Sequence, residues 1–115
     1  MIALETIQDM FDNIRNNTEW NIDGPMLWGY FFTDESLEKL ESIVPSLEAQ
    51  GYRYVGVFEA DIEDGEMPYY FLHAEKEETH SVASLNERNQ HLYALAELHN
   101  LASYDGMDVG PIEEQ

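Results

Sequence analysis

Histidines and carboxylates gather on one predicted strand, where their spacing could hold a metal ion. His73, Glu75 and Glu77 alternate along the chain, so their side chains would share one strand face, and His80 follows closely. Imidazole and carboxylate ligands together suit divalent transition metals. Neighbours on one strand face lie about 7 Å apart, so a complete site would need ligands from another strand. We therefore expect a surface histidine among solvated acids, with no metal and no cofactor.

Other segments fall short of known chemical motifs. Residues 61–66, with the sequence DIEDGE, resemble a calcium loop but lack the ligand pattern of an EF-hand, so we interpret them as a hairpin connection. The chain has no cysteine, which excludes disulfides and thiolate nucleophiles. It also lacks a phosphate-binding glycine loop and a Gly-x-Ser-x-Gly elbow. None of these motifs therefore marks an active site, and a pair of acids for general acid/base catalysis stays open in a chain with 24 carboxylates.

The net charge is the most unusual bulk property of the chain. Its 115 residues include 24 Asp and Glu against 5 Lys and Arg, which gives a net charge of −19. Such a field repels nucleic acid and anionic lipid and favours basic partners, although the same acids also keep a small domain soluble. No apolar run approaches the length of a membrane span, and the N-terminus lacks the basic region of a signal peptide. We expect a cytoplasmic protein.

The elements that would position these residues follow from hydrophobic periodicity. Apolar residues spaced by three and four predict a short amphipathic helix over residues 1–16. Pro45 would remove a backbone hydrogen bond from the next helix, so a kink or a restart is expected there. In order, the patterns beyond the first helix predict a strand at 26–32, a helix at 34–51, strands at 52–60 and 69–77, a helix at 81–100 and a strand at 104–111.

This order of elements, βαββαβ, is typical of a ferredoxin-like α+β sandwich. We expect one domain over residues 1–115, with the ferredoxin-like core at 26–112 and the first helix as an addition. The sheet would be antiparallel, with strand order 4-1-3-2 and two helices on one face. The other face would stay open unless the additional helix or a loop covers it.

Aromatic residues on the two predicted central strands define a possible interaction surface. Leu27 and Phe31 are apolar too, which leaves the inward side of the first strand open. RNA-recognition modules stack bases on such a face, but the basic RNP1 pattern is absent and a charge of −19 removes the attraction for phosphate. We therefore expect a protein partner or a homodimer contact, with a covered face as the alternative. The residues predicted to share the open face are Trp28, Tyr30 and Phe32 on the first strand, and Tyr69, Phe71 and His73 on its neighbour.

The predicted last strand, residues 104–111 with the sequence YDGMDVGP, contains two acids and two glycines, which strands normally avoid. Gly106 and Gly110 would permit backbone angles that other residues avoid, and Asp105 or Asp108 could hydrogen-bond the local backbone. We predict a bulged edge strand, which would protect the sheet from unwanted pairing. A direct binding role for the segment is the alternative.

Tyr104-Asp105-Gly106, following a helix that contains Leu95-Ala96-Glu97 in a small acidic domain, resembles the RraB family of regulators of ribonuclease E activity. The resemblance covers residues 28–111, and its motif positions include Asp108 and Gly110. It implies a non-catalytic protein that binds ribonuclease E, or another basic RNA-processing protein, and damps RNA decay.

Two features depart from the family members associated with this inhibition. They carry Trp where this chain has Met107, and long acidic tails where the sequence ends at Gln115. A fold shared with a regulator does not fix the partner. The alternative is a small ligand-binding or enzymatic domain that uses the open sheet face, with His73 as its polar group.

Overall fold

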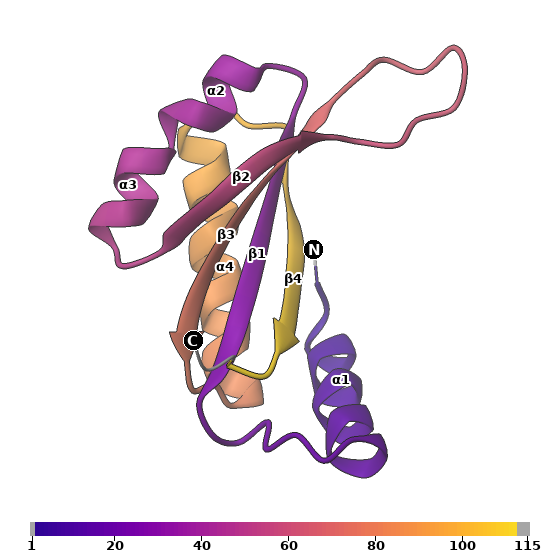
Figure 1. Cartoon of the computed structure of the whole chain (residues 1–115), viewed down its shortest axis with the longest axis vertical. Helices are drawn as coiled ribbons and strands as arrows, with labels where there is room; N and C mark the ends of the chain where they lie inside the picture. Colours follow the sequence, from indigo (N-terminus) through magenta and orange to yellow (C-terminus); the bar gives the residue numbers. More distant parts are fainter. Residues whose placement is uncertain (1, 113–115) are drawn as a thin grey trace.

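The computed structural model describes residues 2–112 as a four-stranded antiparallel sheet with helices packed on one side (Figure 1). The strand order β2-β3-β1-β4 confirms the predicted ferredoxin-like arrangement. The strands are β1 Met26–Asp34, β2 Arg53–Glu59, β3 Tyr70–Glu78 and β4 Ser103–Gly110, and the helices are α1 Leu4–Asn17, α2 Leu37–Ser42, α3 Val44–Ala49 and α4 Val82–Leu98.

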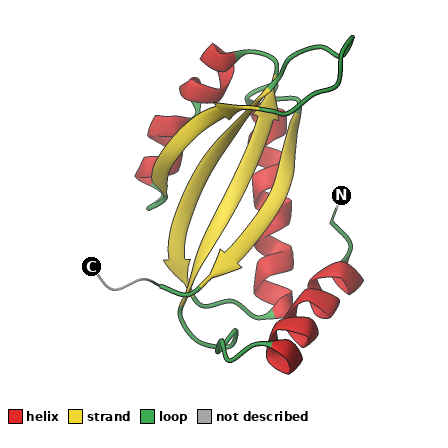
Figure 2. Ribbon diagram, turned by 45° about the vertical axis from the view of Figure 1, so that its right-hand side comes forward, coloured by secondary structure: helices red, strands yellow, loops and turns green. Residues whose placement is uncertain are grey.

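The hydrophobic core lies between the sheet and the helices, and the other sheet face is left uncovered by the helices (Figure 2). Leu85 and Leu92 of α4 and Leu40 and Leu47 of α2 and α3 are fully buried. They meet the inward side chains of β1 and β3, which include Leu72. Each such side chain contributes about 1.5–3 kcal/mol by leaving water, so this layer holds the sheet in place.

The predicted helix at 34–51 is interrupted near Pro45, as expected. Helix α2 ends at Ser42 and α3 begins at Val44, so Pro45 occupies the first turn of α3. A proline is tolerated there because the backbone N–H groups of the first turn have no partner within the helix. The proline therefore separates two short helices and does not lie inside a longer one.

Strand β4 carries the predicted bulge. Phe31 pairs with Gly106 while Phe32 pairs with Tyr104, which leaves Asp105 as the extra residue on the edge strand. Gly106 has a φ of +147°, a backbone conformation that residues with a Cβ rarely adopt. The glycine of the Tyr-Asp-Gly motif is thus explained by the local backbone.

Helix α1 packs beside α4, beyond the β4 edge (Figure 1). Its Ile7 and Phe11 are fully buried, and the Phe11 ring stacks on Trp28 with 6.0 Å between ring centroids. The backbone N–H of Ile2 donates a hydrogen bond to the Tyr93 hydroxyl at 2.7 Å. Helix α1 therefore extends the helical layer, and does not cover the open face of the sheet.

Candidate functional site

Three aromatic residues predicted to lie on the open face lie on the helical side instead. Trp28, Tyr30 and Phe32 are fully buried. Tyr30 pairs with Ala74, which is buried in the same core, so this set shares the face that the helices cover. The prediction for these residues was wrong because their large rings bury more apolar area against the helices than the alternate residues of β1 would.

The other three predicted residues do lie at the open side. Phe71 and His73 are half-buried on the open face of β3, and the Tyr69 ring lies 5.5 Å from the Phe71 ring. Two further rings complete the surface, since Phe58 stacks on Phe71 at 5.3 Å and Phe31 stacks on His73 at 4.5 Å. We call these five residues the open-face aromatic band.

Phe58 was not predicted from the sequence as a member of the band, and the side on which Phe31 lies was left open. Phe31 lies in the apolar run of β1, where residues of both parities are apolar, so alternation gives no signal. Phe58 is 48% exposed on the edge strand β2, and its partner Phe71 is visible only once the strand register is known. The available signal for Phe58 was an aromatic residue near the end of a predicted edge strand.

The next row of residues across the sheet is polar. Glu75 pairs with Arg53 of β2 on one side and with Gly29 of β1 on the other, and Gly29 in turn pairs with Asp108 of β4. Arg53 and Glu75 form an ion pair. This row places Asp108, a carboxylate without an ion pair among residues 2–112, next to the open-face aromatic band.

Gly29 is the floor of a small cradle between His73 and Asp108. A Cβ built on Gly29 would lie 2.3 Å from Asp108 Oδ1 and 2.8 Å from His73 Nε2, so both polar atoms converge over the glycine. A glycine inside a strand weakens it and often marks a close approach. Here the groups that come close to the glycine are the side chains of Asp108 and His73, and both can form hydrogen bonds to a ligand.

The surroundings of the His73 imidazole favour its neutral form. Burial lowers the pKa of His73, the Asp108 carboxylate opposes this by raising it, and Arg53 lowers it further. Within residues 2–112, His73 Nε2 is buried and has no hydrogen-bond partner. A neutral imidazole can present this nitrogen as an acceptor.

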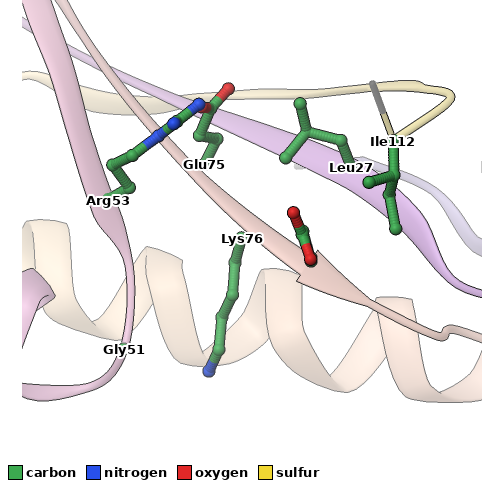
Figure 3. Close-up of a pocket in the computed structure, with 7 residues that line it drawn as sticks. Leu27, Gly51, Arg53, Glu75, Lys76 and Ile112 are labelled. Carbon is green, nitrogen blue, oxygen red and sulfur yellow. The ribbon is translucent and has the colours of Figure 1, made fainter. Parts of the chain in front are cut away.

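A hollow of about 620 Å³ continues from this row toward the end of β3 (Figure 3). Figure 3 shows the side-chain ends of Arg53 and Glu75 together, while Lys76 extends to the other side of β3. The Lys76 ammonium donates to the Gln50 carbonyl at 3.0 Å, so both lining cations are engaged within the protein. The lining residues are Leu27, Gly51, Arg53, Glu75, Lys76, Glu77 and Ile112.

The helical side contains a buried charged network centred on Glu78. Its carboxylate accepts hydrogen bonds from the Tyr30 hydroxyl at 2.6 Å, Arg88 at 2.7 Å and His80 Nε2 at 2.8 Å. Burial alone would raise the pKa of Glu78, but the hydrogen bonds from His80, Tyr30 and Arg88 lower it to about 2. The network ties β3 to α4, and its groups satisfy one another.

His73, Glu75 and Glu77 share the open face of β3, but the structure does not bring the fourth candidate metal ligand to them. His80 is buried on the helical side, where its Nδ1 lies 3.0 Å from the Ser84 hydroxyl, whereas His73 lies on the open face. No group of three or more potential ligands that could hold a metal ion occurs within residues 2–112. None of the helices in that range combines the length and the apolar character needed to cross a bilayer.

The few cations of the chain are occupied by internal contacts. Arg15 pairs with Asp12 at 3.5 Å, and the Lys39 ammonium donates to the Asn100 carbonyl at 3.2 Å. The other three, Arg53, Lys76 and Arg88, have carboxylate partners within the sheet. The remaining carboxylates therefore present a strongly negative surface to any partner.

The family motif lies at the edge of the sheet, and its residues divide between the two faces. The Tyr104 hydroxyl donates to Asn89 Oδ1 in the core at 2.7 Å, and its ring packs edge-on against Tyr93 at 5.1 Å. Gly106 forms the bulge, while Asp108 and Gly110 pair with open-face positions of β1. Tyr104 and Gly106 thus have structural explanations, and Asp108 does not.

Comparison with known proteins agrees with the resemblance inferred from the sequence. The family model described as RraB, regulator of ribonuclease activity B, matches residues 4–109. A search of curated proteins gave no match. The family match runs from α1 to β4 and includes both the open-face aromatic band and the edge-strand motif. The chain therefore belongs to the RraB family of regulators of ribonuclease activity.

Proposed function

We propose that this protein is an acidic, non-catalytic regulator that binds ribonuclease E, or another basic RNA-processing enzyme, and slows RNA decay. The observation that carries this proposal is the family match over residues 4–109. The choice of ribonuclease E follows from the sequence resemblance described above. The regulatory character of the family supports the absence of catalysis.

The charge of the molecule supports a basic partner. A net charge of −19 accelerates encounters with a basic segment, by about 10-fold to 1,000-fold in well-steered systems. Because the chain's own cations are held in internal contacts, few of them would repel such a segment. Salt would weaken the attraction, since the Debye length is about 10 Å at about 0.1 M ionic strength.

The same charge suggests how binding would regulate. Basic segments of RNA-processing enzymes hold RNA by its phosphates, and this attraction depends on the cations that they expose. A protein with a negative surface competes for those cations. Binding outside the catalytic centre would therefore reduce the hold of the enzyme on RNA without any chemical step by the regulator.

A cleavage assay tests this function. The assay would use two forms of ribonuclease E, the intact enzyme and its isolated catalytic domain. Each form would cleave a labelled RNA with and without this protein, at about 50 mM and at about 300 mM salt. We expect slower cleavage by the intact enzyme at low salt, less effect at high salt, and no effect on the isolated catalytic domain. Unchanged cleavage by the intact enzyme at low salt would remove ribonuclease E as the target.

One observation favours a second candidate, the binding of a small ligand on the open face. His73 Nε2 is buried without a partner within residues 2–112, and such an atom costs free energy unless a ligand or water reaches it. Thermal-shift measurements with divalent metals and a metabolite panel would test this candidate. A homodimer through the open faces is tested separately by sedimentation at high concentration, where a monomer would exclude it.

A further inference from the structure

The two stacked rings of the open face each have one side on which the residue paired across the strands is a glycine, so no cross-strand side chain lies there. His73 pairs with Phe31 on one side and with Gly56 on the other, while the other neighbour of Phe31 is Gly106. The rings of His73 and Phe31 are nearly parallel, with an interplanar angle of 14°. Glycines therefore flank the stacked pair on both sides: a Cβ added at Gly56 would meet no described atom within 4 Å, and one added at Gly106 would lie 3.9 Å from Ile2 Cδ1.

A carboxylate lies on β4 in the row next to Phe31, opposite Gly29. Asp108 lies two residues along β4 from Gly106, and both pair with residues that belong to the open face. Asp108 is exposed, and its Oδ1 leans over Gly29 toward His73 Nε2. Asp108 Oδ1 and His73 Nε2 thus converge over Gly29, which has no side chain, and Phe31 is the next open-face residue of β1.

We propose that this cradle, formed by Phe31, His73 and Asp108 over Gly29, binds an arginine side chain of a basic partner protein, an assignment that rests on the proposed function.

The chemistry of each group fits a guanidinium. A guanidinium is planar and stacks on aromatic rings, and its fork of N–H donors matches a carboxylate, here Asp108. A further N–H can reach His73 Nε2, the acceptor without a partner in the described residues. Because burial lowers the pKa of His73, the imidazole stays neutral and does not repel the cation. A lysine ammonium lacks the plane and the fork.

The charges around the cradle favour a cationic protein segment over RNA. Glu77 follows on the same face of β3, and Arg53, the cation of the adjoining row, is paired with Glu75. With a net charge of −19, the protein repels the phosphates that would accompany any stacked base. Complementary charge therefore selects a basic protein segment as the occupant.

Two peptides of equal charge and length test the assignment, one alternating arginine with glycine and one alternating lysine with glycine. Their affinities would be measured by titration calorimetry, and their binding site by NMR on the isotope-labelled full chain. We expect the arginine peptide to bind about tenfold more tightly, as expected for a stacked and forked guanidinium. Its resonance shifts should centre on Phe31, His73 and Asp108.

Variants separate the cradle from the general charge. Asp108→Asn should weaken the binding of the arginine peptide about tenfold and remove the preference for the arginine peptide over the lysine peptide. Phe31→Leu keeps an apolar side chain but removes the ring, and should reduce the same preference. Glu97→Gln, an exposed position on α4, loses the same charge and should affect both peptides equally and weakly. Circular dichroism would verify that each variant is folded.

Several results would overturn the assignment. Equal affinity for the two peptides, or resonance shifts centred away from the cradle, would contradict it. An oligoribonucleotide that shifts the same resonances at equal salt would assign the face to RNA instead. A concentration-dependent dimer that buries Phe31 and His73 would assign it to a second copy of the chain.

A negative result in the peptide experiment and a negative result in the ribonuclease experiment refute different proposals. Arginine-selective binding at the cradle with no ribonuclease association would leave the surface chemistry intact and remove the proposed function. Ribonuclease binding that the Asp108→Asn variant retains in full would keep the function and refute the cradle. Loss of ribonuclease binding in Asp108→Asn but not in Glu97→Gln supports both.

Discussion

At the scale of single residues, Glu78 shows how a buried charge is stabilised by its neighbours. Its side chain is 10% exposed, and it accepts hydrogen bonds from three side chains. The Arg88 guanidinium that pairs with it also lies 5.5 Å from the centre of the Tyr52 ring. Removing one partner from such a cluster leaves the others buried and unpaired, which is costly.

Replacing Glu78 should therefore destabilise the fold. We expect Glu78→Gln to lower the free energy of unfolding by about 3 kcal/mol, because the amide cannot pair with Arg88 as a carboxylate does. Urea unfolding followed by circular dichroism would measure this loss. Glu87→Gln, an exposed position of α4, is the matched control and should change stability by less than about 0.5 kcal/mol.

The same residue predicts a dependence of stability on pH. The pKa of Glu78 is about 2 in the folded protein against an ordinary value of 4.5, so its contribution is complete above pH 4.5 and is lost as pH falls toward 2. The difference in stability between the wild type and Glu78→Gln should shrink over that interval. A difference that stays constant from neutral pH down to pH 2 would contradict the assignment.

Gly29 allows a test of the cradle that spares the fold. In Gly29→Ala the new Cβ would displace the ends of the Asp108 and His73 side chains, both on the open face. We expect stability to change by less than about 1 kcal/mol, because the gain in strand propensity offsets the displacement. Binding of the arginine peptide should fall at least severalfold.

Gly56→Ala is the control for this substitution. No atom lies within 4 Å of the Cβ that it would add, although it lies next to His73 in the sheet. Peptide binding should be weakened less than in Gly29→Ala. If Gly29→Ala bound the peptide as tightly as the wild type, Asp108 and His73 would not act together.

At the scale of elements, the edge strand β4 depends on one glycine. Gly106→Ala places a side chain at a φ of +147° and should destabilise the fold by about 1–3 kcal/mol. Gly110, on the same strand, has no positive φ, and no atom of residues 2–112 would lie within 4 Å of an added Cβ, so Gly110→Ala should be nearly neutral. Thermal unfolding would compare the two, and equal midpoints would argue against a conformational role for Gly106.

Much of the element structure was predictable from sequence because it depends on local chemistry. Pro45 cannot continue a helix interior, and the glycines and acids of the last strand disfavour regular pairing, so the break and the bulge followed from residue type. The strand order followed from the alternation of elements. These features need no knowledge of distant contacts.

The candidate site was only partly predictable because it depends on the register between strands. In β1, Trp28 and Phe31 are both aromatic, and only packing against the helices determines which of them faces inward. The convergence of His73 and Asp108 over Gly29 joins three strands that are distant in sequence. Polar residues of this kind carry no periodic signal.

At the scale of the whole molecule, charge and shape act together. The helical layer and α1 bury the largest rings, and the open face keeps a smaller aromatic band beside Asp108. The net charge of −19 would attract a basic segment from a distance, and the band would hold it once bound. Long-range attraction and local recognition should therefore respond differently to salt and to mutation.

The most direct test is the dissociation constant for ribonuclease E, measured by titration calorimetry over a series of salt concentrations. We predict binding at low salt that weakens steeply as salt rises, that requires the part of the enzyme outside its catalytic domain, and that Asp108→Asn weakens more than Glu97→Gln. Absence of binding at low salt, or an affinity that does not change with salt, would contradict the account of an acidic regulator that recognises a basic partner.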